Sequence, residues 1–264
     1  MNGRRRWLAV GGVVLAAALL WLGLGWGGER RDEVWERIQR DGVIRVGMDA
    51  SFPPFEVVTE AGEFVGYDVD LARELARHLG APRVEFVNIH FDGLYDALLD
   101  AKCDIILSAL PFDREMTEDV VYSTPYFHAG QVLLAAEARP EVAGLESLEG
   151  GALAVELGSE AHYLARQWAQ RKGAALEIRT ALTAQEALDL LGEGQVDAAI
   201  VDAVTALQAL GARQGLRPVG EQLTDEPYVI AAPLGSDILL DRLNRALASL
   251  REAGLFETLE GRWF

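Results

Sequence analysis

The sequence predicts an α/β protein built from two similar lobes. Strand-like apolar runs alternate with amphipathic helix-like runs, a pattern typical of a parallel sheet covered by helices. This β-α-β-α-β rhythm occurs twice, over residues 43–108 and again over residues 153–202. Half of the 264 residues are apolar, so the chain can bury the cores of two lobes.

The first lobe is expected to begin after a charged, loosely helical segment at residues 29–41. A strand is predicted at residues 43–48. Pro53 and Pro54 then predict a loop over residues 49–55, because proline cannot donate to regular strand pairing. The other elements expected here are a small hairpin (55–58 and 63–65), helices at 66–79 and 91–101, and strands at 84–87 and 104–108.

The predicted helix at residues 66–79 has the clearest local signals. Gly66 opens it, and Gly80 and Pro82 stop it. Its first turns are acidic, which suits the positive end of a helix dipole. Its apolar residues recur at helical spacing, at Val69, Leu71, Leu75, Ala76 and Leu79. We expect this crossover helix to hold the loop at residues 49–55 against the sheet.

The second lobe repeats the first. Residues 109–126 are expected to form a loop with a short charged helix from about Asp113, and residues 131–136 a strand. After a connection at 140–151, the predicted elements are strands at 153–157, 176–179 and 198–202, a tight turn at 158–160, and helices at 161–171 and 184–191. A strand at 228–232 and helices at 239–250 and 254–263 follow.

Charge and cysteine content exclude several classes of function. The net charge is −17, and an acidic body is repelled by phosphate backbones, so we expect no nucleic-acid partner. Cys103 is the only cysteine of the chain, so neither an intrachain disulfide nor a cysteine metal cluster can form. We expect no metal and no cofactor.

Residues 1–28 are predicted to direct the chain to a membrane. Three arginines at 4–6 precede an uncharged run at 7–28, which as a helix would span about 33 Å, enough for a bilayer core of about 30 Å. The arginines should stay cytoplasmic, so the body is exported. A cleaved signal peptide and an uncleaved transmembrane signal anchor both remain open. The length of the run and the poor cleavage site at Gly25-Trp26-Gly27 favour the anchor.

Short motifs along the body carry a family resemblance. The pattern glycine-aromatic-acidic-apolar-acidic stands at residues 66–70, where it runs on into the predicted helix. Further blocks are Arg45-Val46-Gly47, Pro53-Pro54-Phe55, Phe91-Asp92-Gly93-Leu94, Ser123-Thr124-Pro125-Tyr126, Gly158-Ser159, Val196-Asp197-Ala198 and Asp225-Glu226-Pro227-Tyr228. Taken together and in order, they make the chain from about Trp35 to Phe264 resemble the bacterial solute-binding proteins of polar amino-acid ABC transporters (solute-binding family 3).

The resemblance implies a periplasmic-binding-protein-like fold of type II. Two parallel-rich sheets would be joined by two hinge strands, near residues 126–133 and 224–230. Lobe 1 would hold residues 42–128 and 227–264, lobe 2 would hold residues 129–226, and residues 29–41 would form a spacer or first helix. The implied function is non-enzymatic, an extracytoplasmic protein that binds a small polar solute (an amino acid or related amine). The implied partners are ABC permease subunits, and the protein is expected to act as a monomer.

The resemblance also implies a set of ligand-binding residues in lobe 1. Phe52 and Phe91 match aromatic residues that cover the ligand side chain, whereas the alternative for both is core packing. Asp49 matches a contact to basic ligand side chains, and its alternative is to cap the following loop. Ser108 and Leu110 match the segment that offers backbone groups to the ligand.

The other matches concern the two ends of an α-amino acid. Ser159 matches a contact to the α-carboxylate at a helix N-terminus, and Asp202 matches the partner of the α-ammonium; its alternative is to cap a helix from Ala203. The family's carboxylate-binding arginine is missing, because Met116 occupies its place. Either Arg114, two residues earlier, replaces it, or the ligand is not a standard α-amino acid and the acidic pocket, with Asp49, Glu156 and Asp202, holds a cation.

Two other classes of function stay open from the sequence. A membrane-anchored sensory module would suit the N-terminal segment. A cyclohexadienyl-dehydratase-like enzyme would need a general acid beside a carboxylate clamp. His90 and His128 are the histidines near the loops that face the expected cleft, and both are more typical of structural or surface positions. We therefore predict no catalytic residue.

Overall fold

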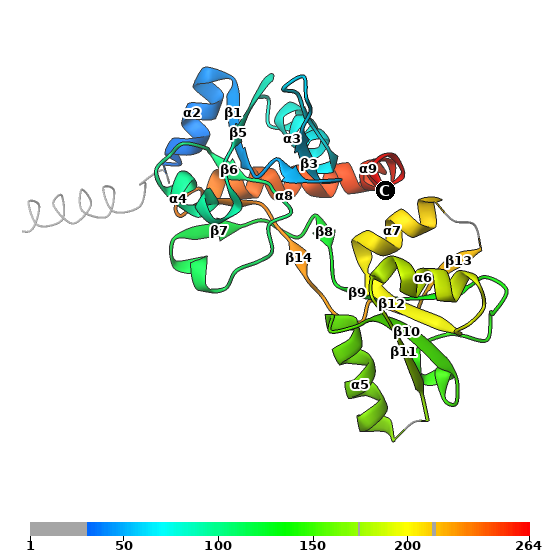
Figure 1. Ribbon diagram of the computed structural model, residues 1–264. Helices are drawn as coiled ribbons and strands as arrows, with labels where there is room; N and C mark the ends of the chain where they lie inside the picture. The colour runs from blue at the N-terminus through cyan, green and yellow to red at the C-terminus, as the bar shows by residue number, and fades with distance from the viewer. Residues whose placement is uncertain (1–30, 174, 213–214) are drawn as a thin grey trace, which may run out of the picture.

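The computed structural model describes residues 31–173, 175–212 and 215–264 (Figure 1). It contains two five-stranded sheets, each with its own helices, joined by a narrow pair of strands. We call the unit around the first sheet lobe 1 and the unit around the second sheet lobe 2. The predicted α/β fold with two parallel-rich sheets and two hinge strands is confirmed.

The lobe 1 sheet has its first strand at the centre of the parallel part. Strand β1 pairs in parallel with β5 on one side and with β6 on the other. β15 comes from much later in the chain and pairs antiparallel with β6 and β7. In sheet order the strands are β5 (Arg83–Asn88), β1 (Val43–Met48), β6 (Ile105–Ile106), β15 (Ala231–Pro233) and β7 (Val120–Tyr122).

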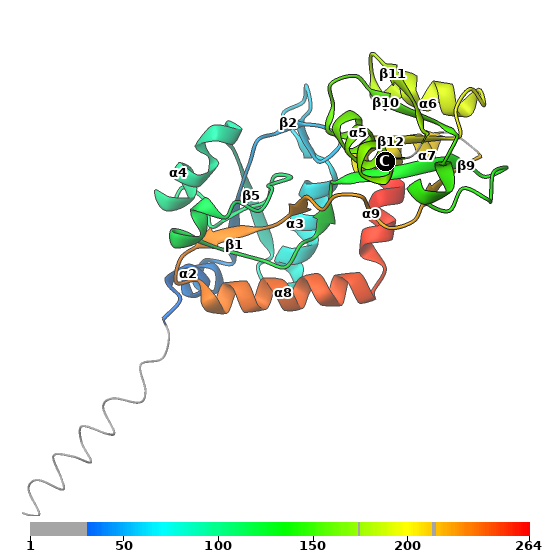
Figure 2. The same ribbon diagram turned by 90° about the horizontal axis from the view of Figure 1, so that it is seen from below.

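Both faces of this sheet are buried. In β6, Ile105 belongs to one apolar cluster and Ile106 to another, as expected when successive side chains alternate across a strand. The larger cluster is covered by α2 (Glu33–Asp41), α3 (Tyr67–His78), α8 (Asp237–Glu252) and α9 (Leu255–Trp263), and the smaller one by α4 (Leu94–Leu99). The late helices α8 and α9 thus pack on lobe 1 (Figure 2).

The lobe 2 sheet repeats the same order. Its first parallel strand lies between the second and the third, and the strand that enters from lobe 1 pairs antiparallel with the third. The order is β11 (Glu177–Ala181), β10 (Ala152–Glu156), β12 (Ala198–Asp202), β9 (Gln131–Ala136) and β13 (Leu216–Val219). Its helices are α5 (Glu160–Lys172), α6 (Ala184–Gly192) and α7 (Ala203–Ala212).

Two crossing segments join the lobes. β8 (Phe127–His128) and β14 (Pro227–Tyr228) pair antiparallel, and we call them the hinge pair. Beyond them, Gly130 lies so close to the second segment that an added Cβ would stand 1.9 Å from the carbonyl oxygen of Thr224. Only glycine therefore lets the two crossings approach at this point.

Three local predictions were wrong. The loop at 49–55 contains a short strand, β2 (Ser51–Phe52), which pairs with β3 (Glu56–Val58), and the prolines lie in the turn between them. β3 also pairs with β4 (Phe64–Val65). The predicted strand at 228–232 is split between β14 and β15, because its first residue pairs across the hinge and its later ones with the lobe 1 sheet. The helix predicted at 91–101 starts as a 3-10 turn, Phe91–Gly93, and α4 ends at Leu99.

Two further sequence predictions concern the N-terminal segment and the lobe boundaries. The signal peptide or signal anchor at residues 1–28 lies outside the described residues. Within the described ranges, no helix combines the length and apolar character needed to cross a membrane. The lobe boundaries at 128/129 and 226/227 stay a prediction; both fall at the ends of the hinge pair.

Candidate functional site

A cavity of about 280 Å³ opens on lobe 1 at the carboxyl ends of β1 and β6. This edge of a parallel sheet is the usual ligand position in open α/β sheets. The cavity is lined by Asp49, Ser51, Phe52, Glu56, Phe91, Ser108, Ala109, Pro111 and Tyr228. It therefore brings together four of the eight residues that the sequence predicted, Asp49, Phe52, Phe91 and Ser108.

Asp49 holds two loops of the cavity together. Its Oδ2 accepts a hydrogen bond from the Phe91 N–H at 2.8 Å, and its Oδ1 accepts one from Ser51 Oγ at 2.6 Å. The loop-capping interpretation is thus what the structure shows. A carboxylate oxygen can accept more than one bond, so the same group remains able to face a cationic ligand.

The two aromatic residues of the cavity are unusually exposed. Phe52 is 47% exposed and Phe91 is 43% exposed, which is high for phenylalanine. Phe52 stacks on the fully buried Phe55 with ring centroids 5.7 Å apart. Their free faces can cover an apolar stem or contact a cation.

Ser108 and Ala109, in the segment after β6, line the cavity. Ser108 Oγ accepts the Asp49 N–H at 2.9 Å and donates to Glu56 Oε1 at 2.7 Å. Ala109 has a positive φ of 41°, rare for a residue with a Cβ. Leu110 is buried in the smaller core, and its carbonyl accepts the Val229 N–H, so Leu110 does not line the cavity.

The structure brings neither Arg114 nor Met116 into the cavity. Arg114 precedes the 3-10 helix Glu115–Glu118, and its side chain is exposed. Met116 packs against the smaller core around α4. No arginine, lysine or histidine lines this cavity among the residues that the structure describes.

The predicted residues of lobe 2 lie at two helix starts. Ser159 caps α5: its Oγ accepts the His162 N–H at 3.2 Å and donates to the Glu156 carbonyl. Asp202 caps α7, with Oδ1 accepting the Thr205 N–H at 2.9 Å. Neither residue lines the lobe 1 cavity.

Lobe 2 nevertheless presents negative charge toward the hinge. Burial raises the pKa of Glu226, which directly precedes β14, and the charges of Glu160 and Asp202 raise it further. Carboxylates on α5 and β12 therefore both act on the carboxyl group that precedes β14. These acidic surroundings would favour the binding of a cation between the lobes.

Five residues of the cavity are not among the eight predicted ligand-binding residues: Ser51, Glu56, Ala109, Pro111 and Tyr228. Pro111 and Tyr228 come from distant segments that form an isolated bridge, a contact that local periodicity does not encode. Glu56 follows the Pro-Pro-Phe motif, and an acidic residue beside an apolar run was the available signal.

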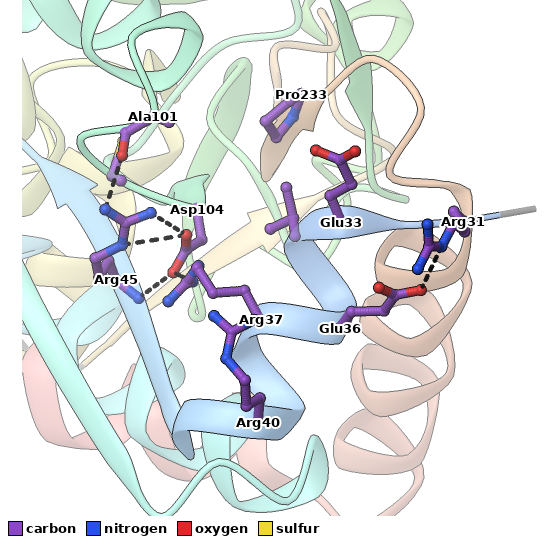
Figure 3. A pocket seen from close by; sticks show the side chains of 11 residues that line it. Arg31, Glu33, Glu36, Arg37, Arg40, Arg45, Ala101, Asp104 and Pro233 are labelled. Carbon is purple, nitrogen blue, oxygen red and sulfur yellow. Dashed lines mark hydrogen bonds and ion pairs between the residues drawn. The ribbon is translucent and has the colours of Figure 1, made fainter.

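A second cavity, of about 440 Å³, lies under α2 at another part of lobe 1 (Figure 3). It is rich in arginine, but each arginine has a carboxylate partner. The pairs are Arg31–Glu36 (3.6 Å), Arg37–Asp104, Arg40–Asp41 (2.8 Å) and Arg45–Asp104 (2.7 Å). With its positive charges already compensated, this cavity is a weak candidate for a ligand site.

The two histidines near the hinge and loops do not line the lobe 1 cavity. His90 is exposed beside Asp92 at 3.8 Å, and His128 Nδ1 lies 2.6 Å from Asp225 Oδ1. In the described ranges, no group of three or more His, Cys, Asp or Glu side chains could hold a metal ion.

Comparisons with known proteins agree with this fold. A model of the bacterial extracellular solute-binding proteins, family 3, matches residues 44–264. The chain is 25% identical over 230 residues to the L-cystine-binding protein TcyJ of Escherichia coli (strain K12), covering 86% of this chain and 85% of that protein. It is 29% identical to the L-arginine-binding protein of Pseudomonas aeruginosa, covering 85% of this chain and 88% of that protein.

Two solved structures are also similar to this chain in fold. An ancestral cationic amino acid solute binding protein, AncCDT-1, is 31% identical with a TM-score of 0.64, covering 88% of this chain and 100% of that one. An ancestral cyclohexadienyl dehydratase, AncCDT-3(P188L), is 25% identical with a TM-score of 0.75, covering 88% of this chain and 96% of that one.

Proposed function

Because the chain belongs to the bacterial extracellular solute-binding proteins of family 3, we propose that it binds a small cationic amino acid or a related amine between its lobes and delivers it to an ABC permease. The main support is the lobe 1 cavity. Two half-exposed phenylalanines and the Asp49 carboxylate line it, and no cationic side chain of the described residues does. Such a lining suits a positively charged solute with an apolar stem.

In this proposal the two lobes share the ligand. Asp49, Phe52 and Phe91 take the cationic side chain, and Asp202 takes an ammonium group. The N-terminus of α5 at Ser159 offers N–H groups and a helix dipole to a carboxylate, where the ligand has one. Closure follows from contacts that the ligand makes only when both lobes reach it.

The exposed position of Arg114 bears on the ligand class. A buried α-carboxylate without a charged partner loses several kcal/mol, on the order of 3. Since Arg114 lies outside the lobe 1 cavity, the proposal favours ligands whose carboxylate is absent or is held by α5 alone. Binding of L-arginine that is unaffected by Arg114→Ala would support the second of these arrangements.

The binding test is a thermal-shift screen followed by titration calorimetry. The probes are L-arginine, L-lysine, L-cystine, L-glutamine, putrescine and spermidine. A cationic probe should raise Tm in proportion to the logarithm of its concentration, as expected for a ligand of the native state. Preference for L-cystine or L-glutamine over every cation would contradict the proposed ligand class.

Asp202→Asn should weaken binding of the preferred cation by about 100-fold, because it removes the charge that faces the ammonium. Asparagine caps helices as well as aspartate does, so α7 should keep its start and the free energy of unfolding should change little. Calorimetry and urea unfolding measure the two effects. Asp100→Asn, at an exposed position away from the cavity, is the control.

Phe91→Ala should weaken binding about tenfold with little loss of stability, because the ring is half exposed and its free face covers the ligand. The matched control is Phe112→Ala. Phe112 is 46% exposed, close to the 43% of Phe91, but it does not line the cavity. Equal affinity losses in the two variants would count against a ligand role for Phe91.

The likeness to AncCDT-3(P188L) makes a dehydratase the alternative to exclude. Prephenate and arogenate should not be turned over by the purified protein. Turnover of either compound that is kept in Asp202→Asn and lost when a cavity residue is changed would make catalysis, and not binding, the proposed function.

A further inference from the structure

Two buried carboxyl groups lie at the lobe 1 cavity: Glu56 lines it, and Asp68 is hydrogen-bonded to Ala109 in its wall. Glu56, on β3, is 1% exposed, and Asp68, in the first turn of α3, is fully buried. The proposed function uses neither of them. Burying an ionised carboxylate is costly, and two side by side cost more, so the arrangement requires a physical explanation.

A chain of hydrogen bonds leads to the pair from both sides. On one side Ser108 Oγ donates to Glu56 Oε1 at 2.7 Å. On the other, Asp68 Oδ2 accepts the Ala109 N–H at 2.6 Å and the Tyr126 O–H at 2.8 Å. One oxygen of each carboxyl group therefore accepts a hydrogen bond.

The other oxygen of each carboxyl group has no hydrogen-bond donor among the described residues. These two oxygens, Glu56 Oε2 and Asp68 Oδ1, are buried. The two carboxyl groups lie close enough for each to act on the pKa of the other. Two ionised carboxylates are both acceptors, so these two oxygens can pair with each other only if one carboxyl group carries a proton.

We propose that Glu56 and Asp68 share a single proton between Glu56 Oε2 and Asp68 Oδ1, and that the negative charge kept on Asp68 positions Ala109 in the cavity wall and Tyr126 at the hinge. Ala109 is held in its left-handed conformation by the bond to Asp68. The pair acts on the ligand through these neighbours, so Glu56 and Asp68 are positioning residues.

The surroundings favour one retained proton. Burial raises the pKa of Glu56, and the Asp68 charge raises it further. Burial also raises the pKa of Asp68, while the bonds from Ala109 and Tyr126 partly offset this. Among the described residues, the other titratable groups that interact with the pair are acids. The Asp49 charge raises the pKa of Glu56 further, Tyr126 donates to Asp68, and the Asp68 charge adds to the rise that burial causes in the pKa of Tyr67 and Tyr228.

Amide substitutions distinguish a shared proton from two charges. In Glu56→Gln the amide N–H takes the place of the shared proton and the amide oxygen still accepts from Ser108. In Asp68→Asn the amide oxygen accepts from Ala109 and Tyr126, and the amide N–H donates to Glu56. Each single variant should therefore fold and change the unfolding equilibrium constant by less than about tenfold.

The double variant Glu56→Gln/Asp68→Asn places two N–H donors against each other. The fold-increase in its unfolding equilibrium constant, relative to the wild type, should exceed the product of the fold-increases in the two single variants by about tenfold or more. Additive effects, or a more stable Glu56→Gln, would mean that the wild type holds two repelling charges, and would overturn the proposal. Urea unfolding at pH 7 measures all four proteins.

Infrared spectroscopy and pH give independent readouts. The wild type should show a protonated carboxyl C=O band at pH 7 that Glu56→Gln lacks. Folding retains a proton that the unfolded chain releases above the ordinary carboxyl pKa, so stability falls as pH rises. Between about pH 6 and pH 8, the logarithm of the unfolding equilibrium constant should rise with pH in the wild type. In Glu56→Gln the slope of this rise should be smaller, and the difference between the two slopes should be at most about one per pH unit.

The effect on the cavity rests on the proposed function and is tested separately. With L-arginine as probe, the double variant should bind about tenfold more weakly than the wild type. Failure of the wild type to bind any probe would refute the proposed ligand class and leave the infrared and unfolding tests decisive for the pair. A wild type without the carboxyl band at pH 7 would refute the pair alone.

Discussion

Gly66→Ala is expected to destabilise the protein by about 5 kcal/mol or to prevent folding altogether. An alanine Cβ at this position would lie 2.0 Å from the carbonyl oxygen of Phe55 and 2.5 Å from its carbonyl carbon. The obstructing atoms are backbone atoms, which no side-chain rotation can move. The φ of 140° adds strain for any residue with a Cβ.

The contact cannot be relaxed without cost, because the start of α3 is bonded to the same segment. The Tyr67 N–H donates to the Pro54 carbonyl at 3.0 Å, and the Asp68 N–H donates to the Phe55 carbonyl at 2.9 Å. Moving the helix away would leave these groups buried and unpaired. It would also move Asp68 away from Ala109 and so disturb the cavity.

Urea unfolding of Gly66→Ala beside Gly62→Ala separates the clash from the strain. Gly62 also has a positive φ, of 80°, but an added Cβ there meets nothing within 4 Å. Gly62→Ala should therefore cost only about 1 kcal/mol. Similar losses for the two variants would show that the close approach of Phe55 contributes nothing measurable.

The role of α3 was predictable from the sequence. The glycine, the acidic first turn and the apolar spacing at residues 66–79 predicted both the helix and its hold on the loop before it. The two hydrogen bonds from Tyr67 and Asp68 to that loop confirm this. Strands such as β1, β9 and β12 were also predicted with their observed bounds, because buried strands read as continuous apolar runs.

The short and composite elements were not predictable in the same way. β7 and β13 are three and four residues long and depend on pairing with segments far away in the chain, β15 and β9. Periodicity over so few residues carries little information. Their existence follows from long-range pairing, which a single sequence does not display.

The candidate site shows a similar division. Asp49 and Ser108 were identified through the family resemblance, and the structure brings them together because the ends of the parallel strands β1 and β6 meet at one sheet edge. Glu56 was missed, since its importance depends on its distance from Asp68, twelve residues further on. The sequence predicted that Met116 occupies the place of the family's arginine, but it left open whether Arg114 replaces that arginine. The answer depends on how the segment after Pro111 packs.

Asp104→Ala should cost about 4 kcal/mol of unfolding free energy, the second-largest effect expected outside the site. Asp104 is 1% exposed and accepts from the Arg45 backbone N–H at 2.7 Å and from Arg45 Nη2 at 2.7 Å; it also pairs with Arg37 (Figure 3). It thereby connects α2 to β1 and the start of β6. Removing one member of a buried ion pair is far more costly than the net contribution of the pair suggests.

The cost arises because the partners cannot reach water fully. The Arg37 and Arg45 side chains are 22% and 25% exposed, and Arg37 Nη2 is buried without another partner among the described residues. Asp41→Asn is the control, since Asp41 pairs with Arg40 at the surface and such pairs contribute less than about 1 kcal/mol. Unfolding monitored by urea and by hydrogen exchange of α2 should show a large loss only in Asp104→Ala. A loss no larger than that of Asp41→Asn would mean that α2 packs on lobe 1 through its apolar residues alone, with the arginine-lined cavity free to exchange its partners.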